Sequence, residues 1–143
     1  MNPPHDPSPD LTEALQTHLA LGHEMLALVI QEHEALHAPG EFDPSLFRER
    51  RKVLLPRLNL SLDHLSQYRQ AWLNLSPDVR AGCPAILGLI QTCQDVIMKT
   101  IVLDRENEQA LLRRGLVPPQ HLPPPQRQQP HFVAALYHRS AAR

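Results

Sequence analysis

Residues 43–75 read DPSLFRERRKVLLPRLNLSLDHLSQYRQAWLNL, and this stretch predicts one long amphipathic helix. It opens with Asp43-Pro44, an N-cap residue followed by proline at the first helical position. Pro56 should kink the helix, because proline removes one backbone hydrogen bond and its ring clashes with the preceding turn. A near-heptad spacing marks the seam of a helix that packs along another helix. The seam positions are Phe47, Leu54, Leu58, Ser61, Leu65, Tyr68, Trp72 and Leu75.

The sequence before this stretch supplies a partner helix over residues 11–38. Asp10 followed by Glu13 resembles a capping box, and Pro39-Gly40 provides the stop. Gly22 in the helix interior costs about 1 kcal/mol relative to alanine unless close packing requires it. The two segments together predict an antiparallel helical hairpin. The apolar stripe of the first helix is formed by Leu15, Leu19, Leu26, Val29, Ile30 and Leu36.

A third helix is predicted over residues 84–114. Cys83-Pro84 marks its start and Gly115 its C-terminal cap. Its second half carries a dense polar patch over residues 104–109. The apolar stretch 85–103 is interrupted by polar side chains such as Asp95 and Lys99, so it predicts a buried helix and no membrane span. The buried face is expected to contain Ile86, Ile90, Cys93, Ile97, Ile101 and Leu111.

The fold class expected is therefore all-α: an elongated antiparallel three-helix bundle with a proline-rich C-terminal tail. Residues 1–10 form a disordered N-terminal segment, 11–115 the bundle, and 116–143 the tail, with an extra short turn near residues 78–81. The tail has six prolines in its 28 residues, which favours extended chain. Near its end, Phe132, Leu136 and Tyr137 form an apolar motif, either a docked helical turn or a partner-binding motif.

Composition narrows the function classes. The formal net charge is −1 and only 4% of the residues are aromatic, so no footprint for nucleic acid stands out. The one basic cluster, at Arg48, Arg50, Arg51 and Lys52, is expected to be a solvated helix face. The N-terminus has no basic and apolar segments of the kind that form a signal peptide, so a cytoplasmic location is expected.

His33-Glu34-Ala35-Leu36-His37 matches H-E-x-x-H, the motif of zinc peptidases. Two histidines at i and i+4 share a helix face, and the glutamate can activate a metal-bound water. However, those peptidases place a β-sheet before the motif helix, whereas here the preceding residues form continuous helix. With nine histidines and eight glutamates in the chain, a chance match arises in roughly three sequences per hundred. We therefore expect no enzyme activity and no cofactor, and a zinc hydrolase that uses His33, Glu34 and His37 remains an alternative.

Three segments resemble bacterial flagellar export chaperones of the FlgN type, which attend the hook-filament junction proteins before secretion. The resemblance covers roughly residues 11–115. The matching residues are Gln31-Glu32-His33-Glu34-Ala35-Leu36, Arg51-Lys52-Val53-Leu54-Leu55-Pro56-Arg57-Leu58, and Leu103-Asp104-Arg105-Glu106-Asn107-Glu108-Gln109-Ala110-Leu111-Leu112.

The resemblance implies a chaperone that captures the amphipathic C-terminal helix of a hook-junction client in a groove along the third helix. Ile97, Ile101, Leu111 and Leu112 would be apolar anchors of this groove. Asp104, Asn107 and Glu108 would lie at its rim and orient the client. A second alternative is a structural adaptor that forms a homodimer through its helical hairpin and presents the tail to a partner.

Overall fold

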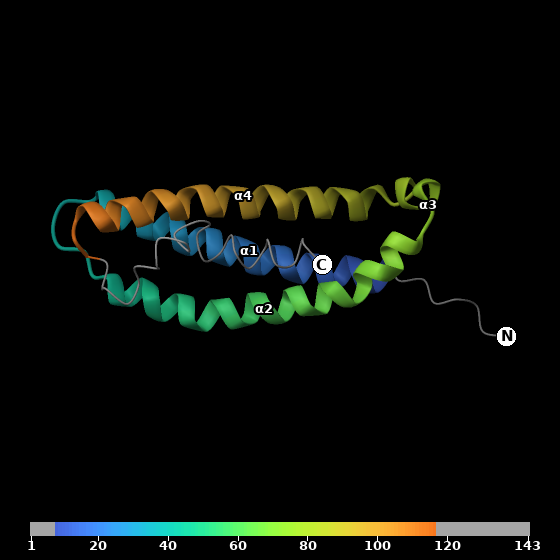
Figure 1. The fold of residues 1–143 in the computed structure, drawn as a ribbon, viewed down its shortest axis with the longest axis horizontal. Coiled ribbons are helices and arrows are strands. Elements are labelled where there is room, and N and C mark those ends of the chain that lie inside the picture. Colours follow the sequence, from blue (N-terminus) through green and yellow to red (C-terminus); the bar gives the residue numbers. More distant parts are fainter. Residues whose placement is uncertain (1–7, 117–143) are drawn as a thin grey trace, which may run out of the picture.

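The computed structural model describes residues 8–116, and this part of the chain contains four helices and no strand. They are α1 (Ser8–His37), α2 (Pro44–Asn74), α3 (Pro77–Ala81) and α4 (Pro84–Arg113). The three long helices lie side by side in an elongated bundle, and the short α3 links α2 to α4 at one end (Figure 1). The expected all-α bundle is confirmed, as is the short turn before the last long helix. Residues 1–10 and 116–143 were expected outside the bundle, and most of them lie outside the described residues.

The helix ends follow from local capping chemistry. Asp43 accepts hydrogen bonds from the backbone N and the Oγ of Ser45, at 3.0 and 2.6 Å, and Pro44 occupies the first turn of α2. Gly115 adopts a φ of +67°, and the amide of Leu116 donates to the carbonyl of Leu111 at 3.0 Å. This is a Schellman motif, which ends α4 and turns the chain back toward the bundle.

Two expectations about the helices need correction. α1 begins at Ser8, so Asp10 lies in its first turn and is not the N-cap. Ile30 was placed on the buried stripe of α1, but it is exposed, because the buried face is centred on Met25, Val29 and Glu32. Pro56 does not end α2, which continues as one helix to Asn74, and Figure 1 shows that this helix is bowed.

α1 is the central helix of the bundle. It packs against α4 and against α2, whereas α2 and α4 make few direct contacts with each other. α1 and α4 run in the same direction, with α2 antiparallel to both (Figure 1). Gly22 lies at the α1–α4 contact, where an added Cβ would be 3.4 Å from Cγ1 of Val96. An alanine at this position would therefore make an ordinary van der Waals contact across the two helices.

The core divides into two apolar clusters, one toward each end of the bundle. The first gathers the second half of α1, the first half of α2 and the end of α4, and it includes the stacked rings of Phe42 and Phe47. The second surrounds Trp72 and joins the opposite ends of the helices. Between them, α2 contributes Ser61, a buried hydroxyl, to the seam with α1.

We expect the buried His18 to make the stability of the bundle sensitive to pH. Its side chain is 3% exposed and its Nδ1 lies 3.0 Å from Oγ of Ser61. Burial lowers the pKa of His18 below its usual 6.5, so the unfolded chain takes up a proton more readily than the folded one. The free energy of unfolding should therefore fall as the pH drops below about 6.5, until the folded-state pKa is passed. Urea unfolding should give a lower free energy of unfolding at pH 5.5 than at pH 7.5. The difference between the two pH values should be smaller in His18→Gln.

Candidate functional site

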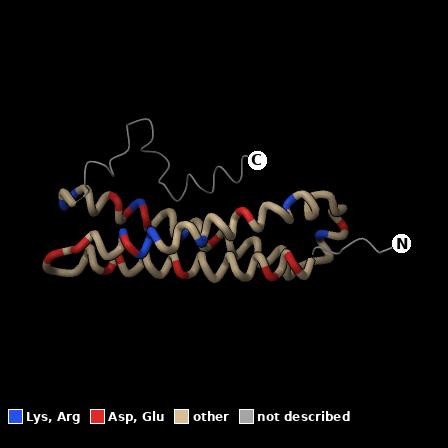
Figure 2. Tube along the Cα trace, turned by 90° about the horizontal axis from the view of Figure 1, so that it is seen from below, with Lys and Arg blue, Asp and Glu red and all other residues tan. Residues whose placement is uncertain are grey.

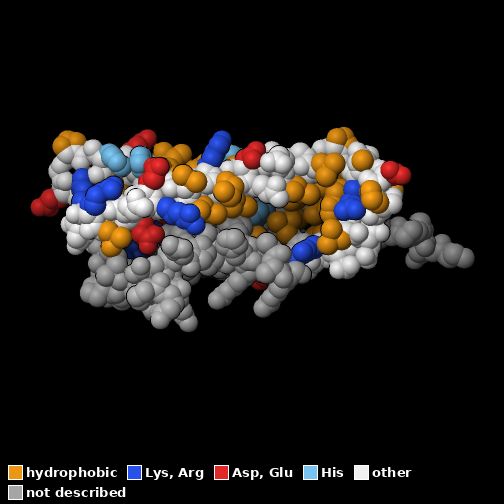
Figure 3. All heavy atoms as spheres, turned by 45° about the horizontal axis from the view of Figure 1, so that its top comes forward, with side chains coloured by type: hydrophobic (Ala, Val, Ile, Leu, Met, Phe, Trp, Pro, Cys, Tyr) orange, Lys and Arg blue, Asp and Glu red, His pale blue; other side chains and the backbone are white. Residues whose placement is uncertain are grey.

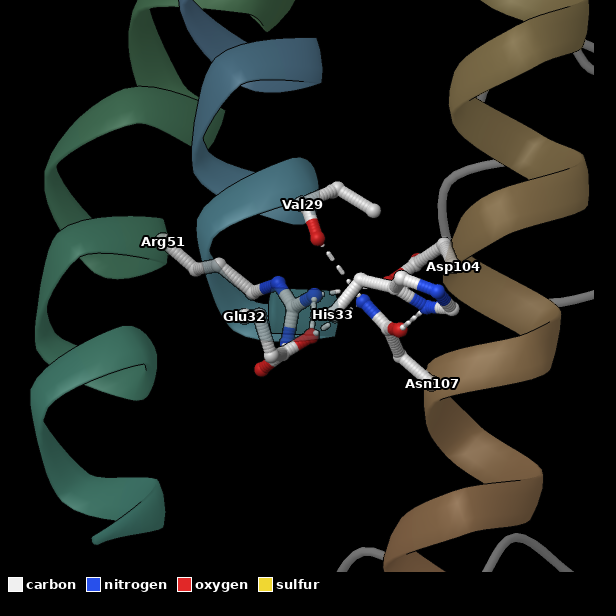
Figure 4. Close-up of polar contacts among 6 residues, drawn as sticks. All are labelled: Val29, Glu32, His33, Arg51, Asp104 and Asn107. Atoms are coloured by element: carbon white, nitrogen blue, oxygen red, sulfur yellow. Dashed lines mark hydrogen bonds and ion pairs between the residues drawn. The ribbon is translucent and has the colours of Figure 1, made fainter. Parts of the chain in front are cut away.

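A charged cluster joins the three long helices toward the end of the bundle where α2 begins and where α1 and α4 end. Arg51 of α2 reaches toward α1 and α4 (Figure 4). Its Nη2 lies 2.7 Å from Oε1 of Glu32 and 2.6 Å from Oδ1 of Asp104, and its Nη1 lies 3.1 Å from Oε2 of Glu32. Both carboxylates are 2% exposed. One guanidinium therefore holds an acidic group from each of the other two helices.

Asn107 extends the cluster along α4 and is fully buried. Its Nδ2 donates to the carbonyl of Val29 at 2.9 Å and to Oε1 of Glu32 at 3.2 Å. Its Oδ1 is therefore the acceptor, and Nδ1 of His33 donates to it at 3.0 Å (Figure 4). We refer to Arg51, Glu32, Asp104, Asn107 and His33 as the polar clamp, because its bonds tie both α2 and α4 to α1.

The electrostatics of the clamp keep Arg51 charged. Burial by itself would lower the pKa of Arg51, but the negative charges of Asp104 and Glu32 outweigh this effect and raise the pKa above the usual arginine value. The Nε of Arg51 is buried without a hydrogen-bond partner. Because two carboxylates meet one guanidinium, the arrangement depends strongly on that single cation.

The clamp corrects two expectations. Arg51 was expected on a solvated helix face, but only 23% of its side chain is exposed. It pairs with buried carboxylates. Asp104 and Asn107 were placed at the rim of a client groove, yet both are buried in the bundle. The missed signal is spacing: Asn107 follows Thr100 by seven residues and Cys93 by fourteen, so it continues the buried face of α4.

The other expected groove residues divide between core and surface. Ile101 is 9% exposed and belongs to the interior, whereas Ile97, Glu108 and Leu111 are half-buried. Leu112 is exposed. Phe132, Leu136 and Tyr137, the apolar motif of the tail, lie outside the described residues.

The histidines of the H-E-x-x-H motif lie next to each other on α1. Their ring centroids are 4.2 Å apart, and Nδ1 of His37 donates to the carbonyl of His33 at 2.8 Å. Both Nδ1 atoms are thus engaged with oxygen acceptors, and the two Nε2 atoms remain to bind a metal ion. Within residues 8–116, however, no group of three or more histidine, cysteine or acidic side chains comes together. In this part of the chain, Glu34 does not complete a three-ligand zinc site with the two histidines.

An apolar surface runs along α4. Leu87, Met98 and Val102 are exposed by 44, 58 and 53% respectively. The half-buried Ile90 and Ile97 lie beside them, and we call these five residues the α4 stripe. Figure 3 shows hydrophobic side chains gathered on the side of the molecule that α4 forms, around a hollow that they line.

The stripe gives α4 an unusual composition for a helix on the surface of a bundle. Among the described residues, α4 is the one helix that is long and apolar enough to cross a membrane, judged by length and composition only. Only 22% of its apolar window is buried in the bundle. The expectation that this stretch is a buried helix is therefore wrong for most of its surface. The physical reason is that α1 is the one long helix on which α4 packs closely, and that α4 has little contact with α2.

The rest of the described surface carries an open depression and a mixed distribution of charge. An open depression of about 450 Å³ lies between α1 and α2, where Leu60 and Tyr68 adjoin Glu13 and His64. Acidic and basic residues are spread along all the long helices, with no face of one sign in the part of the chain that Figure 2 colours. No nucleic-acid footprint thus emerges from the described residues.

The fold and these sites define a three-helix bundle with a buried polar clamp and an exposed apolar stripe. No protein-family model, no curated protein and no solved structure matches the chain.

Proposed function

We propose that this protein is a non-catalytic binding protein that captures an amphipathic helix of a protein partner along the α4 stripe. The observation that carries the proposal is the stripe itself, in which Leu87, Met98 and Val102 are exposed and two further isoleucines are only half-buried by the described part of the bundle. Exposed apolar surface of this kind is typical of sites for protein partners.

The geometry of the stripe favours a helical partner. Its residues span fifteen positions from Leu87 to Val102, or about 23 Å at 1.5 Å per residue. A second helix of four turns that presents residues at i, i+3, i+4 and i+7 would cover this length. Leu55 and Leu62 of α2 are half-buried and share a helix face with Arg51, which bonds to Asp104 of α4. We infer that this face of α2 forms the second wall for the captured helix.

The partner class follows from the resemblance to flagellar export chaperones. The third segment of that resemblance, residues 103–112, directly follows the stripe on α4. We propose that the captured helix is the C-terminal helix of a hook-filament junction protein, held before secretion. Val102 and Met98 would then be the anchors, in place of the buried Ile101.

A binding titration tests the proposal. Peptides from the C-termini of hook-junction proteins of the same genome would be titrated against the full chain by calorimetry. Met98→Asp is expected to weaken binding at least tenfold, because a carboxylate in an apolar contact costs more than about 1.4 kcal/mol. The matched control is Val53→Asp, which puts the same charge on an exposed apolar residue of α2; Val53 is 67% exposed and Met98 58%. Equal effects of the two variants, or no binding of any peptide, would contradict the proposal.

The same stripe also fits a second copy of the chain or a membrane surface. Sedimentation of the full chain without peptide would reveal a dimer, as the adaptor alternative requires. If the wild-type chain is a dimer, Met98→Asp is a monomer and no peptide binds, then the stripe is a self-association surface. If instead the wild-type chain binds anionic vesicles and Met98→Asp does not, the apolar character of α4 serves a bilayer.

A further inference from the structure

The end of α4 is held against the bundle as far as Leu116. The Schellman motif at Gly115 reverses the backbone, and Leu116 packs against the first core cluster. Arg114 fixes this end by donating from Nη2 to the carbonyl of Leu36 at 2.6 Å. Residues 117–143 therefore begin at a fixed point, beside the end of the helix that carries the stripe.

The following sequence has the length and the chemistry to reach the stripe. Fifteen residues separate Leu116 from Phe132, and a proline-rich spacer of this length spans about 45 Å at roughly 3.1 Å per residue. The distance along α4 from Leu112 to Leu87 is about 38 Å at 1.5 Å per residue. Any part of the stripe thus lies within reach of Phe132, Leu136 and their neighbours.

Charge also favours this pairing. Residues 117–143 contain three arginines and no acidic residue, whereas residues 8–116 contain eleven lysines and arginines and fourteen aspartates and glutamates. Arg139 lies two residues after Tyr137, the last residue of the apolar motif. Asp95 and Glu106 are exposed on α4 next to the stripe, and so are Lys99 and Arg105, so the pairing is favoured by the net charges of the two parts. The tail is thus a basic segment with one apolar motif, tethered beside an apolar stripe on an acidic body.

We propose that the segment Phe132–Tyr137 of this chain docks on the α4 stripe and competes with the partner helix for it. Phe132 and Leu136 are spaced i, i+4, so one helical turn would present both to the stripe. A tether of this length supplies an effective concentration on the order of millimolar, so even a weak motif would occupy the stripe. The competition rests on the proposed helix-binding function, whereas the docking itself does not.

The distribution of isoleucines permits a direct test in the full chain. Four isoleucines lie on α4, where Ile90 and Ile97 belong to the stripe, and the fifth, Ile30, is exposed on α1. Methyl NMR spectra would be compared for the wild type and for Leu136→Asp. Docking predicts that the Ile90 and Ile97 methyl signals shift while that of Ile30 stays in place. The control is Gln128→Asp, which adds the same charge to the spacer and should shift none of them.

The outcomes separate docking from competition. Unchanged Ile90 and Ile97 signals in Leu136→Asp would overturn the docking. If the difference between the wild-type and Leu136→Asp signals disappears when the wild type is diluted, the tail docks on a second copy of the chain. That result would overturn docking within one chain. With docking established, Leu136→Asp should bind the partner peptide about tenfold more tightly, for a motif of roughly 0.1 mM intrinsic affinity. Docking with unchanged peptide affinity would overturn the competition. Docking without any peptide binding would instead refute the proposed function and leave the docking intact.

Discussion

Replacement of Arg51 by methionine is expected to lower the free energy of unfolding by about 3–5 kcal/mol, since it leaves two buried carboxylates without their cation. Glu32 and Asp104 lie 2.7 and 2.6 Å from Nη2 of Arg51, and each is 2% exposed. Methionine fills much of the same space, so the loss reports the missing charge more than a cavity. Urea unfolding followed by circular dichroism would measure it.

The neighbouring Lys52 provides the matched control. It pairs with Glu49 at 3.1 Å, but both side chains are about two-thirds exposed. Lys52→Met should cost no more than about 1 kcal/mol, as is usual for exposed ion pairs. Similar losses for the two variants would show that the clamp contributes no more than a surface pair. The triple variant Glu32→Leu, Arg51→Met, Asp104→Leu should recover much of the loss, because no buried charge remains.

Asn107→Ala is expected to be the second most damaging single change, with a loss of about 2–4 kcal/mol. The amide of Asn107 satisfies the carbonyl of Val29, Oε1 of Glu32 and Nδ1 of His33, at 2.9, 3.2 and 3.0 Å. Alanine would leave these groups without their partner and would create a cavity in a fully buried position. Thermal or urea unfolding would give the loss.

Gln109→Ala, two residues along the same helix, is the control for Asn107→Ala. Gln109 is exposed, so its truncation should change the free energy of unfolding by less than about 0.5 kcal/mol. A double-mutant cycle with His33→Ala would measure the coupling across α1 and α4, expected at about 0.5–3 kcal/mol for residues in one network. A loss for Asn107→Ala as small as that for Gln109→Ala would mean that its hydrogen bonds contribute nothing to stability.

The sequence predicts the helix ends well, because their chemistry is local. Asp43 and Pro44 start α2, and Gly115 stops α4, through contacts with residues no more than five positions away. Asp10 misled the prediction of the first helix start, since a carboxylate favours the first turn of a helix as well as its cap. Here it lies in the first turn of α1.

The clamp is harder to predict, because its partners are distant in the sequence. Arg51 is 19 residues from Glu32 and 53 from Asp104, so no local pattern shows that these charges meet. Charged side chains are also mostly exposed, which favours a solvated face for any isolated cluster. Only the helical phase of Glu32 and Asn107, on the buried faces of α1 and α4, indicates the interior.

The sequence shows that α4 is rich in apolar residues, but it does not show which of them stay exposed as the α4 stripe. The sequence identifies the apolar residues of α4, but periodicity does not tell which flank α2 will cover. Ile101 was expected on the buried face, where it lies, and the resemblance also implied that it is a groove anchor; Met98 and Val102, which are exposed, were not among the expected anchors. The sparse contact between α2 and α4 settles which apolar residues stay exposed.

The central place of α1 has a consequence for how the chain is made. Cys93 approaches the carbonyl of Leu15, Asn107 that of Val29 and Arg114 that of Leu36, each pair 78 residues apart. During translation, α1 and α2 emerge with one side of α1 uncovered until the last long helix leaves the ribosome. The bundle therefore closes only after α4 has been synthesised and has left the ribosome. A chain that stalls before α4 would expose the apolar face of α1, and this nascent stage is where aggregation is most to be expected.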